Sequence, residues 1–354
     1  MGQGRAGSAR GRGTHRTTTR RTTLPRTLIT GGFGFLGTWL AAALRRGGHE
    51  VVLVDNREVE GTPLWLSGLL GDPAVSTGRA DVTEPGALDP WGKFDYLLHA
   101  AAVLGVTRVR EAPRSTIMVN TLGTEMTLRF AAQQPDLKRF VLFSTSEVYG
   151  DLAERTTEDD WLSVRVDDPR WSYAVSKAAA EAMTVAYAGE YGLPFVTVRP
   201  FNVYGPLRTS GYAVNALAER ALAGEPLTVH GDGAQVRAWC HVEDFVNGVL
   251  RAMRSPEVAG QAVNIGDDRH VLTIGELAEH IREIAGSASE IRYASTGAPD
   301  IRHRKPNLDR ARTVLGHQPR RDLTDGLRET IAWLRGGSGP YRIELTREDW
   351  PAWE

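Results

Sequence analysis

Short apolar runs alternate with longer segments of helical spacing through much of the chain. The runs have the length of strands, and the longer segments place apolar side chains at the period of a helix. Strands that alternate with helices indicate an α/β fold, in which a doubly wound parallel sheet carries helices on both faces. The predicted strands are residues 27–30, 51–55, 96–99, 140–144 and 195–199, and the predicted helices are residues 37–46, 116–133 and 173–191.

A glycine-rich turn follows the first predicted strand and leads into the first predicted helix. Gly31, Gly34 and Gly37 are spaced as G-x-x-G-x-x-G, which lets the backbone approach a pyrophosphate closely. The N-terminus of the helix supplies amide donors for the phosphates. Asp55 ends the second strand about 20 residues further on, where such turns have their ribose-binding acid. Because a carboxylate there repels a 2′-phosphate, the pattern favours NAD over NADP.

A tyrosine and a lysine share one face of the last predicted helix. Tyr173 and Lys177 are one helical turn apart. A phenol with a pKa of about 10 is a poor base at neutral pH, and a nearby ammonium favours the phenolate. Ser144 and Thr145 stand at the end of the strand before this helix, where a hydroxyl can bond a substrate alcohol. This spacing is common by chance, so its combination with the glycine turn is what indicates a site for alcohol oxidation.

With these motifs the chain resembles the extended short-chain dehydrogenase/reductases of the NAD-dependent nucleotide-sugar epimerase/dehydratase family, over about residues 26–335. The resemblance implies a Rossmann-type domain followed by a smaller C-terminal α/β substrate-binding domain. Further matching strings are Asp81-Val82, His99-Ala100-Ala101, Asn120 and residues 144–150, 199–206, 231–237, 264–266 and 304–306.

The resemblance also implies roles for individual residues. Tyr173 would be the base, Lys177 would hold the nicotinamide ribose, and Thr145 would contact the sugar 4-hydroxyl. Asn202 and Arg237 would bind the diphosphate of a UDP-sugar, since a guanidinium donates to such oxygens in pairs. The implied NAD-binding set is Gly31, Gly34, Phe35, Leu36, Gly37, Asp55, Asn56, Asp81, Val82, Ala100, Ala101, Asn120, Tyr173 and Lys177.

The residues after the catalytic threonine bear on the reaction. Members of the family first oxidise the sugar at C4, and related dehydratases then use an Asp-Glu pair, where this chain has Ser146 and Glu147. The strings at 144–150 and 302–306 resemble UDP-glucuronate decarboxylases of the UDP-xylose synthase type. In that chemistry the C4 ketone is the electron sink for loss of carbon dioxide. We therefore expect Glu147 and Arg304 to be catalytic, with Ser146 and Arg304 contacting the substrate.

Two departures leave other reactions open. Residues 210–212 read Ser-Gly-Tyr where the xylose-forming branch has Asp-Gly-Arg, and Trp171 and Ser172 replace part of its Cys-Tyr-Asp string. Proteins described as 4-epimerases share the Arg-Trp-Ser-Tyr string, so a UDP-hexose or UDP-hexuronate 4-epimerase is the alternative. A non-catalytic NAD-binding regulator is a remote one, because Thr145, Tyr173 and Lys177 are all intact.

Composition limits the partners that the chain is expected to have. The formal net charge is −1, so nothing global draws the chain to nucleic acid or to a membrane. Cys240 is the only cysteine, which excludes an internal disulfide and a thiolate metal cluster, and we expect no metal. The uncharged stretch 27–44 is long enough to flag a membrane span, but its four glycines favour strand, turn and helix. A cytoplasmic location fits these features.

We divide the chain into four parts. The first carries too few apolar side chains to order itself and is expected to be a disordered basic tail. The last is expected to be a strap that docks loosely. The resemblance further implies a homodimer, formed through the helices at 116–133 and 173–191. The parts are a tail at 1–25, an NAD-binding domain at 26–200 that also receives 236–262, a substrate domain at 201–335, and a strap at 336–354.

Overall fold

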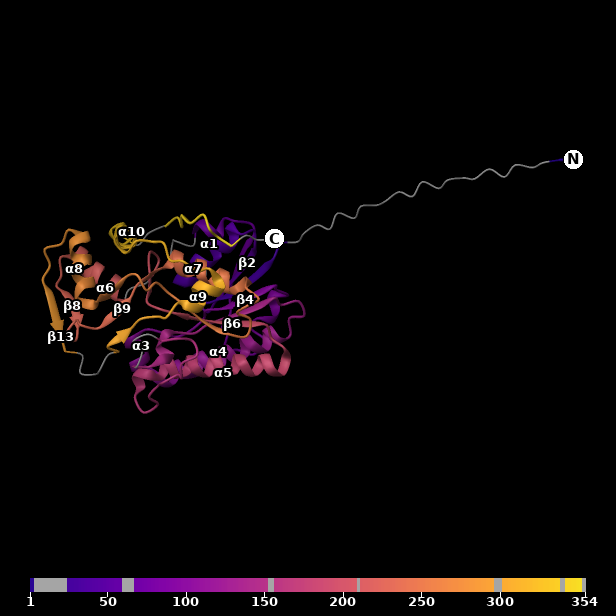
Figure 1. The fold of residues 1–354 in the computed structure, drawn as a ribbon, viewed down its shortest axis with the longest axis horizontal. Helices are drawn as coiled ribbons and strands as arrows, with labels where there is room; N and C mark the ends of the chain where they lie inside the picture. The colour runs from indigo at the N-terminus through magenta and orange to yellow at the C-terminus, as the bar shows by residue number, and fades with distance from the viewer. Residues whose placement is uncertain are drawn as a thin grey trace.

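The computed structural model describes residues 1–2, 24–58, 67–151, 156–208, 211–295, 301–337 and 341–351. The predicted basic tail therefore lies almost entirely outside the described residues, as do parts of the C-terminal strap. Figure 1 shows two parts, a central sheet between helices and a smaller group of helices and strands beside it.

A parallel sheet of seven strands forms the centre of the larger part. Its order is β11-β6-β5-β4-β1-β2-β3, so the chain reverses its direction of growth between β1 and β4. In such sheets, ligands bind in the crevice at this switch point, beyond the carboxyl ends of the strands. The strands are β1 (Arg26–Thr30), β2 (Glu50–Asp55), β3 (Val75–Arg79), β4 (Tyr96–His99), β5 (Arg139–Phe143), β6 (Phe195–Pro200) and β11 (Ala262–Ile265).

Helices cover both faces of this sheet, as predicted (Figure 1). Alternate strand residues face opposite sides, so Ile29 packs in the core under α1 and α7, whereas Leu28 packs in the core under α4 and α5. The doubly wound α/β fold predicted from the hydrophobic pattern is confirmed. These helices are α1 (Phe35–Arg46), α4 (Pro113–Ala132), α5 (Ser172–Tyr191) and α7 (Val242–Arg254), with the short α2 (Ser67–Leu70), α3 (Val106–Glu111) and α9 (Asp309–Leu315) beside them.

The smaller part has its own apolar core, in which Leu217, Val229, Leu277 and Leu327 are buried. Its helices pack beside short two- and three-stranded sheets. The helices are α6 (Ala213–Ala223), α8 (Ile274–Ala285) and α10 (Leu323–Arg335). The strands are β7 (Val203–Tyr204), β8 (Leu227–His230), β9 (Val236–Ala238), β10 (Cys240–His241), β12 (Val271–Thr273), β13 (Ile291–Ala294) and β14 (His303–Arg304).

The segment 236–262 divides differently from the expectation. β9 pairs with β12 and β14 in the three-stranded sheet of the smaller part, so residues 236–238 do not join the larger one. The chain returns to the larger part at α7, which packs on α1. It then continues into β11 at the edge of the central sheet. Because β9 lies beside β14, this arrangement places Arg237 next to Arg304.

Residues 341–351 are held firmly, so the expectation of a loosely docked strap is wrong for this segment. The Arg347 side chain is buried and pairs with the fully buried Asp244 of α7. Its backbone N–H donates to Glu243 at 2.9 Å, and Thr346 donates to the same carboxylate at 2.8 Å. A buried guanidinium needs such partners, which fix the segment over α1 and α7 (Figure 1).

Candidate active site

A cavity of about 410 Å³ opens at the switch point between β1 and β4. The glycine turn forms one end, and segments of the smaller part close the other. It is lined by Gly31, Gly34, Phe35, Leu36, Gly37, Arg57, Ala100, Ser144, Thr145, Ser146, Glu147, Arg170, Tyr173, Lys177, Asn202, Arg208, Tyr212 and Arg304, among others. Most of the residues expected at the catalytic centre therefore share one cavity.

The glycine turn has the geometry that a dinucleotide requires. Gly31 has a φ of +69°, and a Cβ there would stand 2.8 Å from the Ala101 Cα. A Cβ on Gly37 would stand 2.7 Å from the Gly31 carbonyl oxygen, so the turn and α1 pack too tightly for any side chain. The first turn of α1 contains no acidic residue. Its N-terminal amides can therefore receive phosphates, and the residues present fit NAD.

Asp55 lies beside this turn at the end of β2. It is buried, and its Oδ2 accepts the backbone N–H of Phe33 at 3.2 Å. The guanidinium of Arg57, which also lines the cavity, grips both oxygens of the same carboxylate at 2.9 Å. Sequence reasoning identified Asp55 but missed Arg57, whose only signal is its position two residues later.

Several expected cofactor residues do not line the cavity. Asp81 is exposed and accepts two hydrogen bonds from Thr83, and Val82 packs against Gly123 of α4. Asn120 is buried and ties the Val103 backbone, next to the lining residue Ala102, to Ser176 of α5. Asn120 thus holds the cavity wall in place. Asn56 and Ala101 do not line the cavity either.

Thr145, Tyr173 and Lys177 come together, as predicted. Tyr173 is the second residue of α5, and Thr145, which precedes the short helix η4 (Ser146–Tyr149), hydrogen-bonds to it. Burial raises the pKa of Tyr173, and the charge of Glu147 adds to this, whereas the bond from Thr145 and the charge of Arg208 oppose it. The sequence led us to expect that Lys177 lowers the pKa of Tyr173. The pKa is raised instead, because burial is the dominant effect.

The ammonium of Lys177 donates a hydrogen bond to the backbone of the central sheet. Its Nζ donates to the Phe143 carbonyl oxygen at the end of β5 over 2.8 Å. Burial lowers the pKa of Lys177 to about 8, against the opposing charge of Glu181 one turn further along α5. Lys177 lines the cavity and comes from the same helix as Tyr173, one turn further along. The strand end and the helix therefore stay in fixed register.

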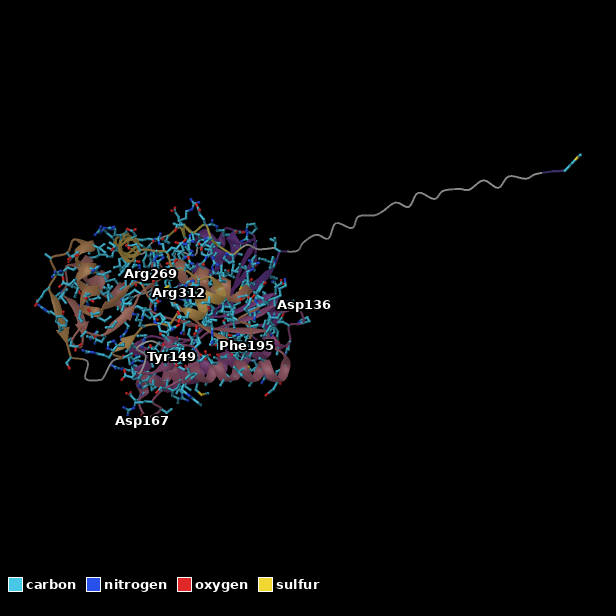
Figure 2. All side chains as sticks on the ribbon, viewed as in Figure 1. Asp136, Tyr149, Asp167, Phe195, Arg269 and Arg312 are labelled. Atoms are coloured by element: carbon cyan, nitrogen blue, oxygen red, sulfur yellow. The ribbon has the colours of Figure 1, made fainter. Side chains whose placement is uncertain are left out.

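A buried ion pair secures α5 to the central sheet. Arg199 of β6 donates to both oxygens of Glu181, at 3.0 and 2.6 Å, and to the Tyr149 hydroxyl at 2.7 Å. Figure 2 shows Tyr149 within the molecule, above α5. Ser144 also donates to Glu181, so its hydroxyl hydrogen is directed at this pair. Thr145 remains the hydroxyl beside the base.

Glu147 lies between two buried arginines. Its Oε2 accepts Arg170 Nη1 at 2.7 Å, and its Oε1 lies 3.6 Å from Arg304 Nη1. Burial alone would raise the pKa of Glu147, but Arg304, Arg170 and Arg237 together hold it below the ordinary value. Glu147 is therefore a carboxylate at neutral pH and can accept, but not donate, a proton.

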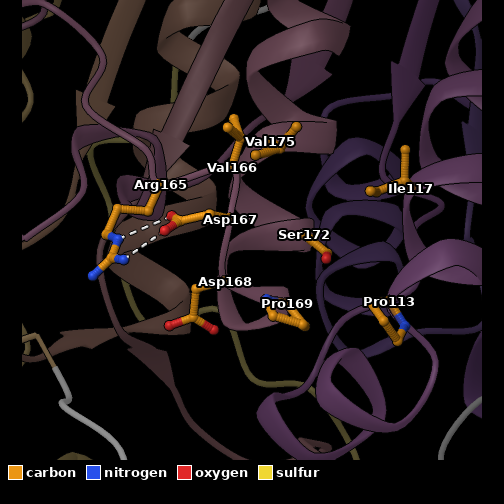
Figure 3. Close-up of a pocket in the computed structure, with 9 residues that line it drawn as sticks. All are labelled: Pro113, Ile117, Arg165, Val166, Asp167, Asp168, Pro169, Ser172 and Val175. Atoms are coloured by element: carbon orange, nitrogen blue, oxygen red, sulfur yellow. Dashed lines mark hydrogen bonds and ion pairs between the residues drawn. The ribbon is translucent and has the colours of Figure 1, made fainter.

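Arg170 is the residue of this cluster that sequence reasoning missed. It lies in the short helix η5 (Pro169–Trp171), directly before α5, and Asp168 caps that helix by accepting the Arg170 N–H at 2.9 Å. Asp168 also lines a second, smaller pocket of about 210 Å³ between the starts of α4 and α5 (Figure 3). There Arg165 folds back onto Asp167, on a loop that projects beyond α5 (Figures 2 and 3).

The expected substrate residues fall into two groups. Ser146, Asn202 and Arg304 line the cavity, and Asn202 is fixed by a hydrogen bond from its Nδ2 to the Ala238 carbonyl oxygen at 3.1 Å. Arg237 does not line the cavity, although it is close enough to act on the charge of Glu147. Arg208 and Tyr212 were missed, and they stack with the guanidinium carbon 3.6 Å from the ring centroid.

Further polar residues lie outside the cavity. Cys240 and His241 are both buried, and the His241 Nδ1 accepts the Glu243 N–H at the start of α7. Within the described ranges, no group of three or more His, Cys, Asp or Glu side chains is arranged to hold a metal ion. In the same part of the chain, no helix combines the length and apolar character needed to cross a bilayer.

Comparison with known proteins gives consistent results. Residues 27–266 match the family described as the NAD dependent epimerase/dehydratase family. The chain is 35% identical over 313 residues to UDP-glucuronic acid decarboxylase 1 of Xenopus tropicalis, covering 88% of this chain and 72% of that protein. It is also 35% identical over 321 residues to a UDP-N-acetyl-alpha-D-glucosaminuronate decarboxylase of Bacillus cytotoxicus, covering 88% and 98%.

Among solved structures, the UDP-glucose 4-epimerase of Thermotoga maritima with UDP-glucose superposes with a TM-score of 0.78 at 26% identity, covering 88% of this chain and 99% of that one. The resemblance inferred from the glycine turn and the Tyr–Lys pair is thus confirmed, and so is NAD as the cofactor of the family. With a match over most of its length and a cavity built for this dinucleotide, the chain belongs to the NAD dependent epimerase/dehydratase family.

Proposed function

We propose that the chain is an NAD-dependent UDP-glucuronate decarboxylase. The observation that carries this proposal is the carboxylate of Glu147 between Arg170 and Arg304, in the same cavity as Thr145 and Tyr173. Arg304 is buried, and its Nε has no hydrogen-bond partner among the described residues. A sugar carboxylate can satisfy this donor, which a neutral hydroxymethyl group does less well.

The chemistry follows from these positions. Tyr173 takes the proton of the C4 hydroxyl, which Thr145 orients, and bound NAD supplies the acceptor for the C4 hydride. The resulting ketone is β to the C5 carboxylate, so the electron pair of the breaking C–C bond passes to the ketone oxygen as carbon dioxide leaves. While the substrate is bound, its carboxylate and that of Glu147 both lie beside Arg170 and Arg304. The departure of neutral carbon dioxide relieves the repulsion between these two carboxylates.

Arg304 acts during this step, and Glu147 acts after it. C5 must regain a proton, and Glu147, as an ionised acceptor, can hold the ring hydroxyl or water that relays it. Arg304 faces the same region and stabilises the developing oxyanion. The product is UDP-xylose when the hydride returns to C4, or a UDP-4-keto-pentose when the ketone leaves.

The relatives support both the reaction class and a choice of substrates. The Xenopus protein is named for UDP-glucuronic acid and the Bacillus protein for its N-acetylglucosamine counterpart, so both uronates are candidates here. A UDP-hexose or UDP-hexuronate 4-epimerase is the alternative, supported by the fold neighbour from Thermotoga maritima. A UDP-hexose 4-epimerase requires no carboxylate receptor, so the unpaired donor on Arg304 favours a uronate substrate over a neutral hexose. Decarboxylation and 4-epimerisation of a uronate differ in the mass of the product.

We also propose a homodimer through the outer sides of α4 and α5. Met118 and Leu122 on α4 and Val185 on α5 are exposed apolar side chains, and the two helices pack closely against each other. Such a face is unfavourable in water unless it is covered. Size-exclusion chromatography with light scattering measures the mass of the protein in solution, and we expect the mass of a dimer. A monomer at micromolar concentration would contradict this assembly.

The decisive experiment incubates the purified protein with NAD and either UDP-glucuronate or its N-acetylglucosamine counterpart, and analyses the products by mass spectrometry. We expect a nucleotide sugar lighter by one carbon dioxide. A product that also lacks two hydrogens identifies release of the 4-keto sugar. Glu147→Gln and Arg304→Met should abolish the mass loss, whereas Asp167→Asn on the projecting loop serves as the unchanged control. An isomer of unchanged mass would instead establish the epimerase.

A further inference from the structure

Two arginines flank the acid at the adenosine end of the cavity, and neither belongs to the residues that the family resemblance implied. Arg57 follows Asp55 by two residues, and Arg79 is the last residue of β3, directly opposite Asp55 in the sheet register. Both therefore stand at the carboxyl ends of neighbouring parallel strands, and Arg57 lines the cavity together with the glycine turn. This is the position where a Rossmann-type fold binds the adenosine ribose.

Arg57 compensates the charge of Asp55. Its Nε and Nη2 donate to the two carboxylate oxygens, each over 2.9 Å, in the paired geometry that a guanidinium and a carboxylate favour. Asp55 is only 6% exposed, whereas the Arg57 side chain is 46% exposed. The acid is thus fixed, and the arginine is free to turn on the open side of the pair.

Arg79 adds a second cation that is readily released. Its Nε donates to the Asn56 carbonyl oxygen at 3.2 Å, and its Nη1 pairs with Glu58 at 2.5 Å. Both partners of the Arg79–Glu58 pair are more than 60% exposed, and ion pairs in such positions contribute little. A more highly charged anion can therefore displace Glu58. Arg57 and Arg79 together balance the charges of Asp55 and Glu58.

This balance changes what the ribose subsite can accept. An isolated carboxylate at this position binds a free 2′-hydroxyl and repels a 2′-phosphate, whereas an arginine nearby accommodates the phosphate. A guanidinium has five N–H donors in a flat fork, and Asp55 takes one edge of it. The same side chain can turn its outer edge to a phosphate while the acid stays neutralised.

We propose that the ribose subsite of this chain accepts NADP as well as NAD, and that Arg57, assisted by Arg79, is the residue that determines the ratio. The inference goes beyond NAD as the cofactor of the family. It concerns only the adenosine end of the cavity, so it holds whichever sugar reaction the other end performs. Asp55 receives the free ribose hydroxyls, and the two arginines receive the 2′-phosphate.

The test uses ligands that carry no nicotinamide, so that it is independent of catalysis. Protein freed of bound dinucleotide is titrated calorimetrically with ADP-ribose and with 2′-phospho-ADP-ribose. We expect the two dissociation constants to lie within about tenfold of each other. Arg57→Ala should weaken the 2′-phosphate ligand by about tenfold or more, and ADP-ribose by less than about threefold. Arg79→Ala should give a smaller loss in the same direction.

Two further variants sharpen the result. Asp55→Asn should weaken ADP-ribose more than its 2′-phosphate, which shows that both ligands occupy this subsite. Arg129→Ala removes an exposed arginine that pairs with Glu125 on α4, and neither residue lines the cavity, so the substitution should change neither constant. The proposal is overturned if wild-type protein binds 2′-phospho-ADP-ribose more than about 100-fold more weakly than ADP-ribose. Equal loss of both ligands in Arg57→Ala would also overturn it, since Arg57 would then only support the fold.

Discussion

The two ends of the cavity carry the same kind of ion pair in different surroundings. At the adenosine end, Arg57 holds Asp55 but is nearly half exposed. At the sugar end, Arg170 and Arg304 hold Glu147, and the three side chains are 15% exposed or less. Exposed pairs exchange partners at little cost, whereas a buried charge must keep a partner. The comparison indicates that Arg57 can turn its exposed edge to a further anion, whereas the charges at the sugar end keep the partners that they have.

The strongest test of the sugar end is removal of its base. Tyr173→Phe deletes the hydroxyl that would take the C4 proton, and we expect turnover to fall by about 10²–10⁴-fold. Binding of ADP-ribose should remain unchanged, because that ligand occupies only the other end of the cavity. Product formation by mass spectrometry and calorimetric titration measure the two effects separately. A parallel loss of both would show that the two ends are not independent.

The effect of burial alone is measured at an ion pair outside the cavity. Arg347→Ala leaves the fully buried Asp244 without its guanidinium, although the backbone N–H groups of Arg320 and Arg321 still donate to it. We expect a loss of about 3–5 kcal/mol in the free energy of unfolding, determined by urea titration.

Asp167→Asn is the matched control for this prediction. It breaks a similar pair with Arg165, with a closest distance of 2.7 Å, but the pair lies on the projecting loop with both side chains more than 60% exposed. The urea midpoint of this variant should not move. If both variants lose the same stability, burial does not distinguish the pairs, and the contrast between the two ends of the cavity loses its basis.

The smallest of these effects is expected for the pH dependence of the sugar end. The arginines hold the pKa of Glu147 below its ordinary value, so the group stabilises the fold above its unfolded pKa, and this contribution is lost as the pH falls through the folded pKa. Arg170→Met removes the closer arginine, and burial then pushes the pKa upward. We expect a loss of about 3 kcal/mol at neutral pH.

The sign of the pH effect separates this prediction from a simple loss of packing. In the variant, Glu147 should be destabilising when charged, so acidification from neutral pH should recover part of the lost stability. Wild-type protein should instead lose stability over the acidic range. Urea titrations at a series of pH values give both curves, and parallel curves would contradict the charged state assigned to Glu147.

The sequence alone was sufficient for the elements with strong local signals. The apolar strands and the glycine turn were predicted because their period and spacing are local properties. β3 and β11, the two edge strands of the sheet, were missed for different reasons. β3 reads Val-Ser-Thr-Gly-Arg and has no fully buried residue, so its apolar pattern is weak. β11 is largely buried but has only four residues, Ala-Val-Asn-Ile, and one of them is polar.

The candidate site divides in the same way. Tyr173 and Lys177 could be paired from the sequence because one helix carries both, and Asp55 because it follows the glycine turn at a set distance. Arg57, Arg170, Arg208 and Tyr212 could not, because their significance comes from partners on other elements. In a chain with many arginines, position in the sequence does not distinguish a buried guanidinium from an exposed one.

By itself, the sequence determined the α/β fold, the dinucleotide turn, and the pairing of base and lysine, since each depends on neighbours within a turn or a strand. Only the tertiary structure decided which charges are buried together. It placed Glu147 between two arginines, directed Ser144 to Glu181, and paired Arg347 of the C-terminal segment with the buried Asp244 of α7. The physical reason is that the energy of a charge depends on its burial and on partners distant in the chain, and neither is a property of the local sequence.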